Sequence, residues 1–519
     1  MRWRIIPGIL AFLIGFLVLG WSSVAVGQEI RFCPGEAAPV AFKPAMGVYE
    51  EGASFDPLMC AEEPCIELLH NIFEPLVSVS NTQVLTPQLA TGWERPDDVT
   101  FRFALRRGVR FHNGERFDAE AVRFSLTRAS QAYGATAWFP EIARVETVDP
   151  YTVDVVLKEP DSLFLYRLGH IGLIQPSRYF RQVGPAEFGE HPVGTGAFRF
   201  VRWEGKRREI HLEANPRYWR KGYPKVKRLT YSYMDSAKAL DLLMKGKLDL
   251  IRRLNPRKTT QFMQMGTGSV VKAWLPQLVL GAFNLLKSPT PLKDLRVRQA
   301  INLAIHREHL IRYGVIGNGR FLGGYTVPED PNHAGLQPYP FSVSKARRLL
   351  QEAGYSKGFT LSIMVDKQVP PQIENIMAVS LRQIGIAVQF KRASESEFLK
   401  EVYLSKFAAA SPPSLDILLL SMPVGTIFHS GNVPMTLLYS KKPNESILSD
   451  PVLDELYEEA LRTYDPVVAS VLWKKLERYV YTNHLLLIGY QERAVFGVHK
   501  RLHFTPRTLM SFWDAYYER

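Results

Sequence analysis

Helical and extended segments alternate in the second half of the chain, and this alternation restricts the fold more than any other feature. Ser344 is placed to cap a helix that stops at Gly354, and an extended apolar segment follows at 360–365. A second helix is predicted over 372–384 and a second strand over 387–390. Strands that alternate with single helices form a sheet covered by helices, so we expect an α/β fold.

The flanking sequence adds elements of both kinds. Further helices, each preceded by an aspartate at the N-cap position, are predicted over 295–314, 451–463 and 466–482. In the first half of the chain, strands are predicted at 30–32, 100–105 and 151–157, and a helix at 66–73. Asn113-Gly114 indicates a tight turn, and Asp118 is a suitable N-cap for a helix over 119–128.

Residues 1–27 have the layout of a secretory signal peptide. A short basic segment precedes an apolar run from Ile5 to Trp21, and small residues follow up to Gly27. We therefore expect cleavage before Gln28 and a periplasmic mature chain. The alternative is an uncleaved anchor, because the apolar run is at the lower length limit for a membrane-spanning helix.

The charge of the chain is strongly positive but dispersed. Lys and Arg number 64 and Asp and Glu 51, which gives a net charge of +13. A dispersed excess affects solubility and weak attraction to anionic surfaces. Nucleic-acid binding requires a clustered basic stripe on a suitable module, so nucleic acid is not an expected partner.

The chain contains three cysteines, Cys33, Cys60 and Cys65. In an oxidising compartment Cys60 and Cys65 are candidates for a disulfide that closes a small loop. Pairing of Cys33 with either of the other two stays open at this point. A zinc site formed by Cys60, Cys65 and His70 lacks a fourth ligand.

The segment HPVGTGAFRF at 191–200 contains two glycines that invite two interpretations. A phosphate-binding fingerprint needs a third glycine three residues after the second and a helix that begins there. Arg199 occupies that position, and Phe198, Phe200 and Val201 indicate a strand. Gly194 and Gly196 are therefore predicted to form a turn.

The order of these motifs resembles that of the family 5 solute-binding proteins of ABC importers, the receptors for oligopeptides, dipeptides and nickel. The stretch LATGWERPDDVTFRFALRRGVRFHNGERFDAEAVRFSL is similar to the signature segment of that family. HPVGTGAFRFVRWEGKRREIHLEANPRYW resembles its P-x-G-T-G-P-[FY] and N-x-x-Y-W segments, with Ala197 in place of proline. Further similar segments are MKGKLDLI, FNLLKSPTPLKDLRVRQAINLAIHRE and YDPVVASVLWKKLERYVYTN, the last with Ser470 at an arginine position.

The resemblance implies a two-lobed periplasmic-binding-protein (Venus-flytrap) fold with mixed sheets and hinge strands. Lobe I would comprise residues 28–276 together with a C-terminal return at 489–519, and lobe II residues 277–488. The lobes would close by a hinge motion around a small ligand, a peptide or peptide-like molecule. The expected partners are this ligand and the permease subunits of an ABC transporter, with the protein itself a monomer. No cofactor is expected. In the family the G-T-G segment is a structural turn.

The candidate ligand-contact residues come from the same resemblance and from strand ends. They are Asn284, Lys367, Ser421, Met422, Thr426, Phe428 and His429. Lys367 would face a ligand carboxylate, with a solvated surface lysine as the alternative. His429 would help to hold a metal chelate if the protein is a nickel-type receptor. That receptor is the alternative function within the family, although a lone histidine is more often structural.

The peptide-binding members of the family carry an aspartate in a W-x-x-D-x-x-D-P stretch, which pairs with the ligand ammonium. The corresponding stretch here, LDILLLSMPVGTIFHSGN, has Ser421 near the tryptophan position, and no acid lies between Asp416 and Glu445. A buried ammonium without a carboxylate costs several kcal/mol. Either another acid supplies the charge or the ligand lacks an ammonium at that end.

A secreted hydrolase is the alternative from another class, and the sequence argues against it. It has no G-x-S-x-G, H-E-x-x-H or Walker motif. His306 and His309 lie three residues apart and could share a metal, but they also suit the polar face of a helix. We therefore expect a receptor without enzymatic activity. Whether it serves import or sensing is left open by the sequence.

Overall fold

The computed structural model describes residues 29–35, 41–43, 48–50, 54–60, 63–132, 139–266, 268–393, 397, 415–423, 429–441 and 446–518. Within these ranges no helix is both long and apolar enough to cross a membrane. The expected signal peptide, residues 1–27, lies outside the described residues.

One mixed sheet runs through the whole molecule. Its strands lie in the order β10-β11-β12-β1-β13-β19-β14-β18-β16-β17, and β15 pairs with β19. Their bounds are Phe198–Glu204 (β10), Glu209–Ala214 (β11), Arg228–Ser232 (β12), Glu29–Cys33 (β1), Leu250–Ile251 (β13), Leu486–His499 (β19), Gly268–Phe283 (β14), Ile417–Pro423 (β18), Phe359–Asp366 (β16), Ile386–Ala393 (β17) and Gly319–Phe321 (β15).

A second, antiparallel sheet of four strands has the order β6-β7-β9-β8. Its strands span Ala90–Glu94 (β6), Thr100–Leu105 (β7), Thr152–Leu157 (β9) and Ile142–Asp149 (β8). Three short ladders complete the strands in the described part of the chain: β2 (Ala41–Lys43) with β3 (Val48–Glu50), β4 (Val77–Val79) with β5 (Leu85–Pro87), and β20 (Leu502–His503) with β21 (Tyr516–Tyr517). The strands predicted at 30–32, 100–105 and 151–157 are confirmed.

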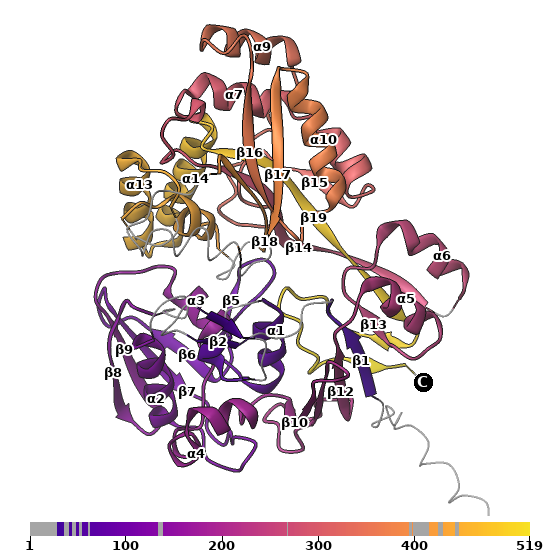
Figure 1. The fold of residues 1–519 in the computed structure, drawn as a ribbon. Helices are drawn as coiled ribbons and strands as arrows, with labels where there is room; N and C mark the ends of the chain where they lie inside the picture. Colours follow the sequence, from indigo (N-terminus) through magenta and orange to yellow (C-terminus); the bar gives the residue numbers. More distant parts are fainter. Residues whose placement is uncertain are drawn as a thin grey trace, which may run out of the picture.

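The elements form two bodies (Figure 1). Lobe I contains β1, β4–β13, β20, β21 and the helices α1 (Glu63–Ile72), α2 (Ala119–Ser130), α3 (Phe164–Ile171), α4 (Ser177–Glu190), α5 (Ser236–Met244) and α6 (Thr259–Gln264). Lobe II contains β15–β18 and the helices α7 (Leu295–Ala304), α8 (Arg307–His309), α9 (Val343–Glu352), α10 (Pro371–Arg382), α13 (Pro451–Arg462) and α14 (Pro466–Thr482). The expected α/β fold in two lobes is confirmed.

The two longest strands, β14 and β19, connect the lobes. The first half of β14 pairs with the second half of β19 within lobe I, and its second half pairs with β18 in lobe II. The β14–β19 register is irregular between Trp274 and Leu278, where the chain passes between lobes. The lobe boundaries predicted at 276/277 and 488/489 lie close to this irregularity and stay a prediction.

Short-range sequence signals define the starts of several helices. Asp118 caps α2, and its Oδ1 accepts hydrogen bonds from Glu120 N at 3.1 Å and Ala121 N at 3.3 Å. Asp450 and Asp465 cap α13 and α14 in the same manner. The cap of α9 differs from the prediction, because Ser342 rather than Ser344 accepts the hydrogen bond from Lys345 N.

The single helix predicted over 295–314 is wrong, because α7 ends at Ala304. Ile305 adopts an extended backbone conformation with φ −73° and ψ 120°. The buried guanidinium of Arg307 then donates to Asn302 O at 2.8 Å and to Ile488 O at 3.2 Å. These bonds satisfy a backbone carbonyl near the end of α7 and another on β19. They therefore stabilise the end of the helix at Ala304.

Candidate ligand-binding site

The carboxyl ends of strands from both lobes point toward the junction between the lobes. In lobe I, β1 and β13 are parallel, and in lobe II, β16, β17 and β18 are parallel. The antiparallel pair β14 and β19 lies between the two groups, so the groups run in opposite directions (Figure 1). Open α/β sheets bind ligands in the crevice outside the carboxyl ends of their strands. The candidate site is therefore this junction.

Asp366 is the last residue of β16 and accepts hydrogen bonds from two backbone amides at the junction. Its Oδ1 accepts from Gln368 N at 2.8 Å and its Oδ2 from Ser421 N at 3.3 Å. Burial raises the pKa of the Asp366 carboxyl group, although these two donors and two nearby arginines oppose the rise. The carboxylate thus lies at a strand end beside Ser421, one of the predicted contacts.

Arg253, which follows β13 in lobe I, reaches lobe II. Its guanidinium donates to Gln368 Oε1 at 2.6 Å, and its backbone has φ 62°, an uncommon value for a residue with a side chain. Burial raises the pKa of Glu492 on β19, and the charge of Arg253 opposes this. The junction therefore presents an arginine and two carboxyl groups, Asp366 and Glu492, in a small region.

A second contact between the lobes is aromatic. The Tyr166 ring on α3 lies 4.5 Å from the His429 ring, centroid to centroid, and the Trp473 ring on α14 lies 5.2 Å from His429. His429 is 5% exposed, and its Nδ1 accepts a hydrogen bond from Gly431 N at 3.0 Å. Burial lowers the pKa of His429 to about 3. The ring is therefore neutral and enclosed.

The structure separates the predicted contact residues into groups. Asn284 is fully buried, with Nδ2 donating to Leu415 O and Oδ1 accepting from two backbone amides, so it stabilises a turn inside lobe II. Lys367 is exposed at the junction, and its Nζ lies 3.5 Å from Glu397 Oε2. Ser421 accepts from Gln277 Nε2 at 3.0 Å, and Met422 packs against the lobe II core. Thr426 and Phe428 lie outside the described residues.

Sequence reasoning missed Arg253, Asp366 and Tyr166. A signal existed for Asp366, because it directly follows a predicted strand and precedes Lys367. No signal existed for Arg253, whose partner Gln368 is 115 residues away in the sequence. Tyr166 meets His429 only because the two lobes touch.

Metal binding by His429 finds no support in the described part of the chain. The groups of three His, Cys, Asp or Glu side chains close enough to share an ion there are Glu187, Glu190 and His191, and Glu204, Glu209 and His211. Neither group includes His429 or the pair His306 and His309, whose rings stack at 3.6 Å.

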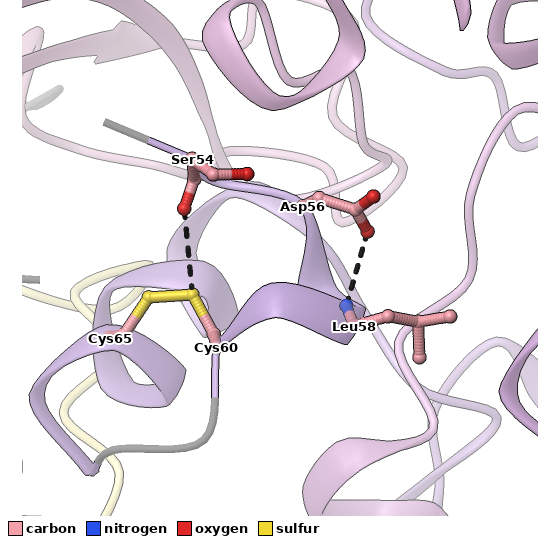
Figure 2. Close-up of a disulfide and its surroundings, with 5 residues drawn as sticks. All are labelled: Ser54, Asp56, Leu58, Cys60 and Cys65. Atoms are coloured by element: carbon pink, nitrogen blue, oxygen red, sulfur yellow. Dashed lines mark hydrogen bonds between the residues drawn. A yellow bond between two sulfur atoms is a disulfide. The ribbon is translucent and has the colours of Figure 1, made fainter. Parts of the chain in front are cut away.

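The disulfide predicted between Cys60 and Cys65 is confirmed, and Figure 2 shows its surroundings. Cys33 is buried and unpaired, so its pairing with either of the other two is excluded. The zinc alternative is wrong, because both sulfur atoms are in the disulfide and His70 Nε2 lies 2.7 Å from His170 O. Beside the disulfide, Asp56 accepts from Leu58 N at 3.1 Å.

The G-T-G segment forms the predicted turn and packs on the end of α1. A Cβ atom on Gly194 would lie 2.0 Å from Ile72 O, and one on Gly196 would lie 2.6 Å from Asn71 O. Thr195 Oγ1 donates to Glu74 Oε2 at 2.9 Å. Glycine is required at both positions because the two backbones approach each other closely, in agreement with the predicted turn.

Glu74 is the centre of a buried network in lobe I. Its carboxylate accepts from Gln88, Thr195, Tyr218 and Trp219. Burial raises the pKa of Glu74, and the hydrogen bonds from Trp219, Tyr218 and Thr195 oppose this rise. The network borders a cavity of about 500 Å³ that lobe I residues line. The conspicuous Tyr218 and Trp219 thus support the fold.

A two-lobed α/β fold whose strand ends face each other across a hinge is the architecture of the periplasmic binding proteins. The model of the family described as bacterial extracellular solute-binding proteins, family 5 Middle, matches residues 84–416. The chain belongs to this family.

Relatives and solved structures agree with this assignment. The glutathione-binding protein GsiB of Pectobacterium atrosepticum is 27% identical over 490 residues, which cover 89% of this chain and 91% of that protein. The DppA protein of Helicobacter pylori, solved with the peptide STSA, has a TM-score of 0.79 at 22% identity and covers 95% of this chain and 99% of that one. NikZ of Campylobacter jejuni, solved with Ni(L-His), has a TM-score of 0.75 at 18% identity, with 94% and 99% covered. These relatives are binding proteins rather than enzymes.

Proposed function

We propose that the protein is a periplasmic receptor that encloses a small peptide or peptide-like ligand between its lobes and delivers it to the permease subunits of an ABC transporter. The signal peptide would be residues 1–27. Lobe I would be residues 28–276 with 489–519, and lobe II residues 277–488. The protein would act as a monomer without enzymatic activity.

The observation that carries this proposal is the convergence of strand ends from both lobes on one junction. Arg253 from lobe I already bonds Gln368 from lobe II at 2.6 Å. A ligand held there contacts both lobes, so its binding free energy favours the closed arrangement. Closure would present a defined surface to a permease.

The charges at the junction favour a zwitterionic ligand. Lys367 and Arg253 supply cationic groups for ligand carboxylates. Asp366 and Glu492 supply the acid that the stretch between Asp416 and Glu445 lacks. A short peptide or glutathione, the ligand named for the Pectobacterium atrosepticum relative, has both kinds of charge.

The test is a native mass spectrum of the gently purified mature protein, followed by a thermal-shift panel. The panel contains glutathione, dipeptides, oligopeptides, sugars and the nickel–histidine chelate. We expect a peptide-like ligand to stabilise the protein, by about 2.7 kcal/mol at a hundredfold excess over Kd. A nickel isotope pattern would instead favour the metal-chelate receptor. Absence of stabilisation by every compound would contradict the receptor proposal.

Transport and sensing are separated by a different measurement. Deletion of the gene should abolish uptake of the identified ligand if the protein serves an importer. Uptake that persists in the deletion strain would contradict the transport role, while leaving ligand binding intact.

A further inference from the structure

A cluster of three potential metal ligands lies outside the lobe junction, on one face of the β10–β11 hairpin. The register places Glu204 opposite Glu209, and His211 follows two residues after Glu209. Residues two apart on a strand project to the same face, as do directly paired residues. His211 Nε2 lies 3.4 Å from Glu204 Oε1 and 3.7 Å from Glu209 Oε2. The three side chains thus converge.

The hydrogen bonds around His211 determine which ring nitrogen carries the proton. Thr230 Oγ1 donates its only proton to Glu29 Oε1 at 2.6 Å. The same hydroxyl lies 3.1 Å from His211 Nδ1, so it must accept there, and Nδ1 carries the hydrogen. In the neutral ring, the Nε2 lone pair then faces the two carboxylates. Nε2 is buried and has no hydrogen-bond partner among the described residues.

Among the described residues, nearby arginines compensate the charge of Glu204 but not that of Glu209. Glu204 Oε1, the oxygen that faces His211 Nε2, also accepts from Arg202 Nε at 2.7 Å, and Arg207 Nε lies 3.6 Å from Glu204 Oε2. Glu209 accepts from the Ser232 hydroxyl at 3.3 Å, and in the described ranges it forms no ion pair with lysine or arginine. A carboxylate and an imidazole lone pair therefore face each other without a donor between them.

We propose that Glu204, Glu209 and His211 bind a divalent metal ion of the zinc class, with water completing the coordination. Zinc bound to nitrogen and oxygen in a tetrahedron places neighbouring ligand atoms about 3.3 Å apart. The separations of 3.4 and 3.7 Å at His211 Nε2 are close to this value. Metal-bound histidines commonly donate their other N–H to an acceptor that fixes the ring, and Thr230 with Glu29 supplies such a chain.

This inference is independent of the proposed function. The ion would link β10 to β11 at the edge of the large sheet, so its effect would be on the stability of lobe I rather than on ligand capture.

The test is titration of the metal-free mature protein with zinc chloride by isothermal calorimetry near neutral pH. We expect one zinc ion to bind with a Kd of about 10 µM or below. His211→Gln and Glu209→Gln should each weaken binding by at least about tenfold, because each removes one of three ligands. His191→Gln, in the exposed group with Glu187 and Glu190, is the matched control and should leave this binding unchanged.

Circular dichroism in a chelator establishes that the variants fold, so that lost binding is not lost structure. Nitrogen-15 NMR of the metal-free protein should show the hydrogen of His211 on Nδ1. Zinc binding that is absent up to about 1 mM, or equal in wild type and His211→Gln, would overturn the proposal. A His211 ring protonated on both nitrogens near neutral pH would also overturn it, since the ring would then simply pair with the two glutamates.

Discussion

His112 clamps the turn that the two glycines form. Its backbone N donates to Gly194 O at 2.8 Å, and its Nδ1 accepts from Gly194 N at 3.3 Å. Because Nδ1 accepts, Nε2 carries the hydrogen and donates to Gly196 O at 3.0 Å. Burial lowers the pKa of His112 to about 4. A residue of the family signature thus has a structural role that depends on a neutral ring.

This pKa predicts a pH dependence of stability. The folded-state pKa of about 4 lies below the unfolded value of about 6.5. The contribution of His112 is therefore complete above about pH 6.5 and is lost as the pH falls toward 4, because the unfolded chain binds the proton first. As the pH is lowered between these limits, the unfolding free energy of wild type should therefore decrease more steeply than that of His112→Gln. The difference in slope should be about 1.4 kcal/mol per pH unit.

Urea unfolding at several pH values measures this difference, with the exposed His191→Gln as the control variant. Parallel pH profiles for wild type and His112→Gln would contradict the prediction.

A second prediction for a single residue concerns Lys367, the proposed contact for a ligand carboxylate at the lobe junction. Its Nζ is exposed, with an equally exposed Glu397 as the ion-pair partner. We expect Lys367→Ala to weaken a carboxylate ligand at least about tenfold, because a direct charge contact is lost. Calorimetry with the identified ligand measures this. Lys357→Ala, at the opposite end of β16, is the control. Unchanged affinity in Lys367→Ala would remove Lys367 from the site.

At the scale of elements, the turn at 194–196 and the end of α1 are one packed unit. A Cβ on Gly194 would lie 2.0 Å from the backbone oxygen of Ile72, which cannot move away without shifting α1. We expect Gly194→Ala to lower the unfolding free energy by about 3 kcal/mol or more. Gly92→Ala, where a new Cβ would contact nothing within 4 Å, should cost less than about 1 kcal/mol.

Urea unfolding compares the two glycine variants, and expression yield replaces it if Gly194→Ala does not accumulate. Equal stability of Gly194→Ala and wild type would contradict the close contact between Gly194 and the backbone of Ile72.

At the scale of the whole molecule, the lobes also touch at the end of α13 and in the loop that leads to α14. Tyr464 OH accepts from Asp161 N at 2.7 Å, and the Arg95 guanidinium lies 3.3 Å from the centroid of the Tyr464 ring. Ser162 N donates to Leu461 O at 2.8 Å. These contacts favour a closed arrangement that competes with opening by the hinge strands β14 and β19.

Removal of Tyr464 should therefore shift the balance toward the open form. We expect Tyr464→Ala to increase the radius of gyration of the ligand-free protein by roughly 1 Å. Small-angle X-ray scattering measures this change, and saturating ligand should reverse it. Tyr313→Ala, at a side chain 49% exposed, is the control. Superimposable curves for wild type and Tyr464→Ala would mean that this contact does not hold the lobes.

The sequence by itself determined those features that depend on neighbours along the chain. Helix caps such as Asp118 act on amides two and three residues ahead, and strand β7 shows its period of two. The disulfide closes a loop between Cys60 and Cys65, five residues apart. The family motifs then identified the two-lobed fold, because their order extends over most of the mature chain.

Only the tertiary structure decided which side chains meet at the junction and which are enclosed. Asn284 and His429 looked alike in the sequence as ligand contacts, yet backbone groups surround the first and aromatic rings the second. The contact between Arg253 and Gln368, and the convergence of His211 with Glu204, arise from strand order and register. No local pattern encodes these distances, because they depend on how separate elements pack.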